Sequence, residues 1–422
     1  MLPGAPHLAR DGASLTLDGV PLESLAREHG TPLYVYSQRA MLEALGGYQR
    51  ALDGREHLIC YAMKANSTLA VLQTFARAGC GVDIVSGGEL ARALAAGVEP
   101  GLIVFSGVGK TRAEMRQALA AGVRCFNVEG LSELDQLSEV AVAMGRRAPV
   151  SLRVNPDVDA GTHPYISTGL RDNKFGIAHD RALDAYRHAA GLPGLDVQGI
   201  DCHIGSQITQ VAPYLDALDR LLDLVEAVEA AGIPLHHLDL GGGLGIQYAQ
   251  DVPPKAEVLV GRMLERLDAR GHGHRPLLLE PGRSLVGNAG VLLTEVLSLK
   301  PGEAKNFCIV DAAMNDMARP AMYQAWMAIE PCAIRDDLDA RSWDVVGPVC
   351  ESGDWLGRDR TLAVAEGDML AVLSAGAYGM TMASNYNTRA RAAEVLIVDG
   401  QPRVVRERER VESLFALETL LP

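Results

Sequence analysis

Lys64 is the residue whose setting in this sequence most directly suggests chemistry. It lies in the stretch 58–66 (LICYAMKAN), where an apolar run passes into a polar turn. A lysine at the mouth of a buried strand can lose its proton through desolvation, and the neutral amine is then a nucleophile. For this stretch alone, the alternative is a lysine that simply reaches solvent at a strand end. Other apolar runs also end in residues that could serve a group bound to this amine, which favours Lys64 as a Schiff-base residue.

Apolar, β-rich runs alternate with helical stretches through the first two thirds of the chain. The runs are 58–62, 82–85, 102–105, 124–128, 150–154, 197–202, 235–240 and 277–280. This number of strand–helix repeats predicts a closed (β/α)8 barrel, whose active site lies at the carboxyl ends of the strands. An open, doubly wound sheet remains the alternative, because a strand count does not prove closure.

The barrel prediction specifies which residues should carry chemistry, namely those at or just after the ends of the runs. They are Lys64, Asp83, Ser106, Asn155, His203, the glycines of 241–245 and Glu280. The glycine-rich turn follows the seventh run, where barrels often bind a phosphate through backbone N–H groups. Such a turn is also a common packing device, so its position is what indicates a phosphate site.

The rhythm changes after Gly290 to alternating, strand-like segments without long helices. This pattern predicts a second, all-β domain, which a strand near residues 14–20 is expected to join. We therefore expect the barrel to span 30–284, and a β-sandwich or β-barrel domain to comprise 1–29 and 285–422. The long interruption at 155–180 is expected to be a functional loop.

Charge and composition exclude several classes of protein. A formal net charge of −14 argues against a nucleic-acid-binding or anionic-membrane surface. No apolar stretch approaches the roughly 18 residues of a membrane span, and the N-terminus lacks the features of a signal peptide, so a cytoplasmic protein is expected. The seven cysteines are scattered without a C-x-x-C pair, and no ligand cluster accompanies the histidines, so we expect neither disulfides nor a metal site.

Eight motifs, in this order, resemble those of the barrel-type pyridoxal-phosphate decarboxylases, and within them the diaminopimelate decarboxylases. They are 61–66 (YAMKAN), 167–176 (STGLRDNKFG), 203–207 (HIGSQ), 241–246 (GGGLGI), 280–283 (EPGR), 319–323 (RPAMY), 347–354 (GPVCESGD) and 376–379 (GAYG). The resemblance runs nearly from end to end. It implies an alanine racemase-like fold and decarboxylation of meso-diaminopimelate to L-lysine, the last step of lysine biosynthesis.

The resemblance also implies a cofactor, pyridoxal 5′-phosphate, and residues that bind it. Lys64 would form the internal aldimine, His203 would lie flat against the ring, and Tyr378 would close over the phosphate. Glu280 would keep the ring nitrogen protonated, so that the ring accepts the electrons left when a bond to Cα breaks. The implied cofactor-binding residues are Lys64, Asp83, His203, Ser206, Gly242, Gly243, Glu280, Gly282, Arg283 and Tyr378. The implied catalytic residues are Lys64, His203, Glu280 and Cys350.

The far end of diaminopimelate carries a carboxylate and an ammonium group. The implied substrate-binding residues are Arg283, Arg319, Tyr323, Glu351 and Tyr378. Arginine offers a two-pronged contact to a carboxylate, and Glu351 an acceptor for the ammonium. Ornithine and lysine have no distal carboxylate, so the arginine pair favours diaminopimelate; related decarboxylases and a non-catalytic homologue remain alternatives. Racemases of the same fold have an arginine at the ring nitrogen, and Glu280 argues against them. One departure follows Tyr323: the stretch 326–328 (WMA) occurs where the family leads us to expect a tyrosine and a histidine.

Finally, the resemblance implies a homodimer with active sites shared between subunits. The loop 350–354 of one subunit would lie over the cofactor of the other. Cys350 would be the acid that protonates Cα after carbon dioxide leaves. A lone cysteine is more often a buried hydrophobic residue, and it is the surrounding motif that suggests the catalytic role.

Overall fold

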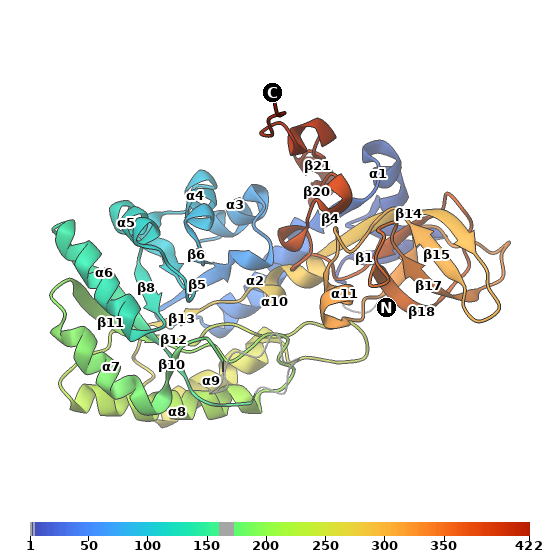
Figure 1. The fold of residues 1–422 in the computed structure, drawn as a ribbon. Coiled ribbons are helices and arrows are strands. Elements are labelled where there is room, and N and C mark those ends of the chain that lie inside the picture. The colour runs from blue at the N-terminus through green and yellow to red at the C-terminus, as the bar shows by residue number, and fades with distance from the viewer. Residues whose placement is uncertain (1, 3–4, 160–172) are drawn as a thin grey trace. The chain divides into compact units, whose positions relative to one another are not determined.

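The structure of the protein is a computed structural model that covers residues 2, 5–159 and 173–422 (Figure 1). The chain divides into two compact units. The barrel unit comprises 44–245 and 252–284, and the β unit comprises 1–43, 246–251 and 285–422. Much of the interruption at 155–180, and part of the motif at 167–176, lie outside the described residues.

Within the described residues, eight parallel strands close into a barrel. In order around the ring they are β5 (His57–Ala62), β6 (Gly81–Ile84), β7 (Ile103–Phe105), β8 (Cys125–Val128), β9 (Ala148–Asn155), β11 (Leu195–Asp201), β12 (His237–Asp239) and β13 (Leu277–Leu279). The ring closes where β13 pairs with β5, with Leu278 opposite Leu58. Closure confirms the predicted barrel and excludes the open sheet. A short strand, β10 (Ile177–Ala178), pairs with β9 beside the ring.

Helices follow the strands and cover the outside of the barrel (Figure 1). They are α3 (Leu69–Arg77), α4 (Gly87–Ala95), α5 (Arg112–Ala121), α6 (Leu131–Ala143), α7 (His179–Gly191), α8 (Ala212–Ala230) and α9 (Ala256–Ala269). Local sequence sets their ends. In α5, Thr111 and Glu114 form a reciprocal capping box, and Gly122 ends the helix in the left-handed conformation. The helix buries Met115, Ala118 and Leu119 against the barrel unit, because residues three and four apart share one face.

The β unit is built mainly from a large mixed sheet in the order β18-β17-β15-β14-β4-β20-β21, which β19 and β16 extend. Its strands are β4 (Leu33–Ser37), β14 (Gly290–Lys300), β15 (Phe307–Val310), β16 (Ile329–Pro331), β17 (Arg341–Val346), β18 (Trp355–Leu362), β19 (Met369–Val372), β20 (Ala393–Val398) and β21 (Gln401–Arg406). A small antiparallel sheet of β1 (Leu8–Asp11), β2 (Ser14–Leu17) and β3 (Val20–Pro21) precedes it. The remaining α-helices are α1 (Leu22–His29), α2 (Gln38–Ala51), α10 (Arg283–Val286) and α11 (Arg319–Tyr323).

The domain boundary expected at residue 30 does not agree with the place of strand β4 in the structure. The boundary at residue 30 assigns 33–37 to the barrel, whereas β4 pairs with β14 and β20 of the large sheet. Leu33 and Val35 of β4 are fully buried with Val291 and Leu293 in the core of the β unit. A five-residue apolar run carries no information about which sheet it joins, so the sequence alone did not separate the two possibilities.

The described residues include no helix that is long and apolar enough to cross a membrane.

Candidate active site

Lys64 is held by a buried carboxylate at the end of the first barrel strand. It lies in the turn Met63–Ala65 after β5, and its Nζ donates to Asp83 Oδ2 at 2.5 Å. Asp83 is fully buried inside β6, and not beyond its end. The second oxygen, Asp83 Oδ1, has no hydrogen-bond partner among the described residues. A fixed amine next to a spare acceptor atom can hold a bound group by both a covalent bond and a hydrogen bond.

Glu280 follows β13 and lies among buried polar side chains. Its Oε1 accepts hydrogen bonds from Asn127 Nδ2 at 3.3 Å and from Ser106 Oγ at 3.5 Å. Burial, and then the negative charges of Asp239 and Asp83, raise the pKa of Glu280 well above its ordinary value. Glu280 therefore keeps its proton to higher pH than an exposed glutamate does.

The glycine turn after β12 needs glycine because other backbone approaches it closely. A Cβ atom on Gly242 would collide with the carbonyl oxygen of Glu280, and one on Gly243 with that of Gly205. Gly243 also has a φ of 98°, which side chains rarely adopt. Ile208 N–H donates to Gly243 O at 3.0 Å, so the turn is fastened to the segment that follows His203. The N–H groups of Gly241 and Gly245 donate within the protein, to Asp239 Oδ1 and Ile208 O, so a phosphate at this turn would depend on the other N–H groups of the turn.

His203, Ser206 and Arg283 surround this turn in the barrel unit. His203 Nδ1 accepts a hydrogen bond from the N–H of Gly242 at 3.2 Å. Burial, and then the positive charges of Arg153 and Lys64, lower the pKa of His203 well below its ordinary value, so the ring is neutral at neutral pH. Arg283 Nη2 donates to Ser206 Oγ at 3.0 Å. The hydroxyl and the guanidinium are thus brought together, as an anion site requires.

The remaining predicted residues belong to the β unit. Arg319 begins α11, is buried, and lies over the ring of Tyr248, with its guanidinium carbon 4.4 Å from the ring centre. Tyr323 ends the same helix and is half-buried. Tyr378 has a φ of 54°, a conformation uncommon for a bulky residue that marks candidate functional positions.

Cys350 is exposed, whereas the other six cysteines are buried. The loop that carries it is shaped by Asp354, which accepts hydrogen bonds from the backbone N–H groups of Met314 at 2.6 Å and Val349 at 2.7 Å. The neighbouring Glu351 accepts a hydrogen bond from Tyr386 Oη at 2.7 Å. The loop therefore presents a thiol and a carboxylate to the outside of the β unit.

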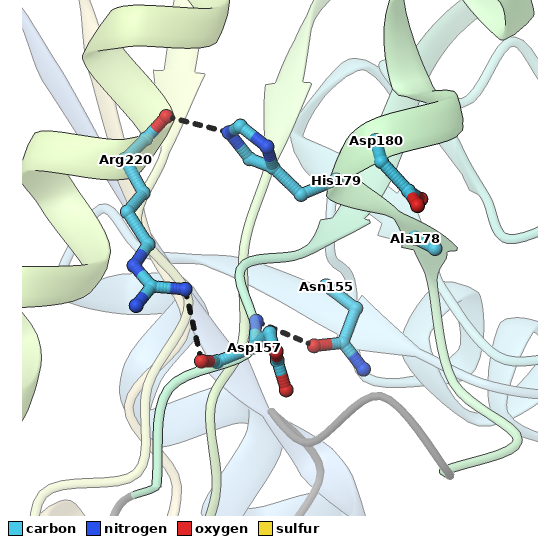
Figure 2. A pocket seen from close by; sticks show the side chains of 6 residues that line it. All are labelled: Asn155, Asp157, Ala178, His179, Asp180 and Arg220. Atoms are coloured by element: carbon cyan, nitrogen blue, oxygen red, sulfur yellow. Dashed lines mark hydrogen bonds between the residues drawn. The ribbon is translucent and has the colours of Figure 1, made fainter.

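A separate pocket lies by the carboxyl end of β9 (Figure 2). It has a volume of about 200 Å³ and is lined by Asn155, Asp157, Ala178, His179, Asp180 and Arg220. Of the strand-end residues expected to carry chemistry, it contains Asn155 but not Lys64 or Glu280. Arg220 Nη1 donates to the carbonyl oxygens of Pro156 and Asp157, and Arg220 O contacts His179 Nε2 at 3.1 Å. These hydrogen bonds tie α8 to the segment after β9.

Several buried polar residues of the barrel interior were not singled out from the sequence. They are Asn127 in β8, Arg153 in β9, Asp201 in β11 and Asp239 in β12. Asn127 is the only polar residue of its strand, whereas the strands of Arg153, Asp201 and Asp239 contain other polar residues. Alternate residues of a barrel strand face the interior, but the sequence does not show which set does so, and this signal was too weak to identify the four residues.

The barrel residues fit pyridoxal phosphate by the chemistry of their donor atoms. An amine beside a carboxylate suits the aldehyde and phenolic oxygen of this cofactor, a glycine turn with a serine and an arginine suits its phosphate, and a buried glutamate suits its ring nitrogen. A (β/α)8 barrel with this set of groups defines a pyridoxal-phosphate enzyme of the barrel class.

Comparisons with known proteins lead to a particular family. The pyridoxal binding domain of the pyridoxal-dependent decarboxylases matches residues 39–287. The diaminopimelate decarboxylase of Pseudomonas aeruginosa is 58% identical over 411 residues, which cover 97% of this chain and 98% of that protein. The diaminopimelate decarboxylase of M. jannaschii, solved with L-lysine, has a TM-score of 0.94 at 38% identity and 99% coverage of both chains. The corresponding Helicobacter pylori structure with L-lysine has a TM-score of 0.90 at 41% identity, with 94% of this chain and 98% of that chain covered. The chain belongs to the diaminopimelate decarboxylase family of pyridoxal-dependent decarboxylases.

Proposed function

We propose that this protein is a pyridoxal-phosphate-dependent decarboxylase that converts meso-diaminopimelate to L-lysine and carbon dioxide. The observation that carries the proposal is the pair of groups at one end of the barrel: the Lys64 amine held against Asp83, and the buried carboxyl of Glu280. Support for the substrate comes from relatives of this name that cover nearly the whole chain.

Residues of the barrel unit would bind and orient the cofactor. When bound, pyridoxal phosphate supplies a ring that accepts the electrons left at Cα as carbon dioxide departs. Lys64 carries the reactive amine and Asp83 holds it in place, while neutral His203 provides a flat, apolar face for the ring. Ser206, Gly242, Gly243, Gly282 and Arg283 bind the phosphate side, and Tyr378 of the β unit closes over it.

Substrate selection is proposed to depend on two arginines and an acid. Arg319 is buried and stacked on Tyr248, so its guanidinium is fixed and can bind a carboxylate at little entropic cost. Arg283, Tyr323 and Tyr378 complete the carboxylate side, and Glu351 accepts the distal ammonium group. This set of residues matches the groups of diaminopimelate. Ornithine and lysine have no distal carboxylate that the arginines could bind.

We further propose that two copies of the chain form a homodimer with shared active sites. Cys350 and Glu351 are exposed, although both are assigned chemical roles, which supports a site completed by a second subunit. All seven cysteines lie within the described residues, and none of them forms a disulfide bond. Reduced cysteines support a cytoplasmic location.

The proposed reaction is tested by carbon dioxide release from a panel of amino acids. We expect turnover of meso-diaminopimelate to exceed that of ornithine, lysine and arginine, because only diaminopimelate presents a distal carboxylate to the arginines. Substituting Arg319→Met should reduce this preference, since it removes the charge and keeps an apolar side chain. Highest turnover on ornithine would contradict the substrate assignment, and release from none of them by cofactor-loaded enzyme would contradict the reaction.

A further inference from the structure

Asp239 lies next to Glu280 inside the barrel, and both residues are buried. It is the last residue of β12, and its Oδ1 accepts a hydrogen bond from the N–H of Gly241 at 3.0 Å. Its Oδ2 lies 3.5 Å from Asn127 Nδ2, the same amide that donates to Glu280. One oxygen each of Asp201, Asp239 and Glu280 lie within 4.8 Å of one another.

The cations near these carboxyl groups are already paired elsewhere. Lys64 pairs with Asp83 at 2.5 Å, and Arg153 pairs with Glu129 at 3.1 Å and lies 4.0 Å from Asp201. In the part of the chain that the structure describes, neither Asp239 nor Glu280 forms an ion pair. Burying two carboxylates without a paired cation raises the free energy of the folded state. Such a pair therefore usually retains a proton.

We propose that Asp239 and Glu280 share one proton, so that Asp239 positions Glu280 and the pair supplies the proton required by the cofactor's ring nitrogen. The O–H bond at Glu280 breaks as the N–H bond at the ring forms, Glu280 becomes the carboxylate partner, and no proton is exchanged with solvent. The inference rests on the proposed placement of Glu280 at the ring nitrogen. It assigns to Asp239 a role as a positioning residue.

The electrostatic surroundings agree with this geometry. Burial raises the pKa of Asp239 to about 6, although hydrogen bonds from Gly241, Glu280 and Asn127 oppose the rise. Asp83 and Asp201 add negative charge around Glu280, and Lys64 offsets part of it. Arg153 pairs first with Glu129. It also lowers the pKa of Asp201, but burial and the charge of Asp239 raise that pKa well above its ordinary value. At neutral pH the group thus favours a state in which Asp239 is ionised and Glu280 keeps the proton.

The test counts the protons exchanged when pyridoxal phosphate binds to cofactor-free protein. Calorimetric titrations in buffers of different ionisation enthalpy give this number at each pH. Ionisation of the free cofactor and of Lys64 contributes to this number in native protein and variants alike, so their pH profiles are compared with one another. In the native protein, uptake of a proton from solvent for the ring nitrogen should appear only when the pH is high enough to remove the shared proton. In Asp239→Asn the lost negative charge lowers the pKa of Glu280, so proton uptake should begin about one pH unit lower or more.

Ser106→Ala serves as the matched control, because it removes a neutral contact to Glu280 and leaves the charges unchanged. It should keep the native proton profile. An unchanged profile in Asp239→Asn would overturn the inference. A divalent cation that co-purifies with native protein and is lost in Asp239→Asn would also overturn it, since the cation would then neutralise the pair.

A second variant and a second measurement separate this inference from the proposed function. If Glu280 does not serve the ring nitrogen, Glu280→Gln will keep native affinity and proton profile, and the proposed function of Glu280 fails. If Glu280→Gln changes the profile and Asp239→Asn does not, only the inference fails. Infrared spectra of native cofactor-free protein should show a protonated carboxyl band that disappears on cofactor binding, and this readout holds even if Asp239→Asn does not fold. Absence of the band would contradict a shared proton.

Discussion

Exposure separates Cys350 from every other cysteine of the chain. Burial raises the pKa of Cys80 and Cys332 to about 12, which leaves their thiols protonated and unreactive at neutral pH. Cys350 alone is exposed, on a loop whose backbone is fixed by Asp354. A thiol held in this way can deliver a proton to one face of a carbon atom brought to it.

Replacing Cys350 with alanine should therefore slow turnover about 100-fold or more, the usual contribution of a general acid. The product should also change, because part of the protonation then occurs at C4′ of the cofactor instead of Cα. An aldehyde is then formed in addition to lysine. Measuring both products settles the role. Cys80→Ala is the control and should behave as the native enzyme. Near-native turnover with lysine as the sole product would show that another group supplies the proton.

Asp239 contributes to the pH dependence of folding. Its pKa of about 6 lies above the ordinary 3.8, so the folded state binds this proton more tightly than the unfolded chain. The stabilisation is fully present below pH 3.8 and is lost as the pH rises through about 6. The difference corresponds to about 3 kcal/mol. Denaturant unfolding of cofactor-free protein across this range should show the loss.

Asp239→Asn is the variant that tests this effect, although it also lowers the pKa of Glu280. Burial also raises the pKa of Asp316 to about 6, so part of the slope belongs to the β unit and should persist in the variant. The slope attributable to Asp239 should disappear. Equal slopes in native protein and variant would contradict the assignment.

Among structural elements, the glycine turn after β12 is closely constrained by its neighbours. Its backbone is fastened to the segment after His203 and lies against Glu280, so one element joins the proposed phosphate site to the proposed ring-nitrogen site. This turn was predictable from the sequence, because glycines that follow the seventh strand of a barrel often indicate a phosphate site. The sequence did not predict the inward-facing Asp239 and Asn127, since a polar residue within a short strand does not reveal what it faces.

Gly243→Ala should lower both stability and cofactor affinity. Gly122→Ala is the matched control: Gly122 has a φ of 83°, and a Cβ atom there would meet no other described atom within 4 Å, so it reports the backbone strain alone. That strain costs about 1 kcal/mol. Gly243 adds a collision with the carbonyl of Gly205, and we expect at least a tenfold weaker cofactor affinity by titration, with none in the control. Equal effects of the two variants would show that close approach is unimportant.

Across the whole chain, the residues proposed to carry chemistry are divided between two units. Lys64 and Glu280 belong to the barrel unit, and Cys350 and Arg319 to the β unit. The barrel was predictable because its strands and helices alternate regularly. The β unit was predicted only in outline: β17 and α11 were not expected, since short strands and a five-residue helix give weak periodic signals. The proposed sharing of a site between two subunits rests on the family resemblance, because residue patterns alone do not encode it.

Mixing two inactive variants tests the shared site. Lys64→Ala and Cys350→Ala chains, exchanged into hybrid dimers, should regain part of the native activity, because one of the two sites then carries both native residues. Lys64→Ala mixed with Glu280→Gln is the control and should regain none, since both changes fall in the barrel unit. Demonstrated exchange without recovery would mean that each site is built within one chain.

The central claim is that Lys64 carries the cofactor, and borohydride reduction of cofactor-loaded protein tests it most directly. Reduction fixes the cofactor to the amine that holds it, and mass spectrometry of the peptides identifies the lysine. Lys110 is the internal comparison, because its amine lies in the same barrel unit but is buried and bonded to Gly107 O, Asn127 O and Glu133. We predict the label on Lys64, none on Lys110, and loss of the label in Lys64→Arg. A label on Lys110 or another lysine, or no label on fully loaded protein, would contradict it.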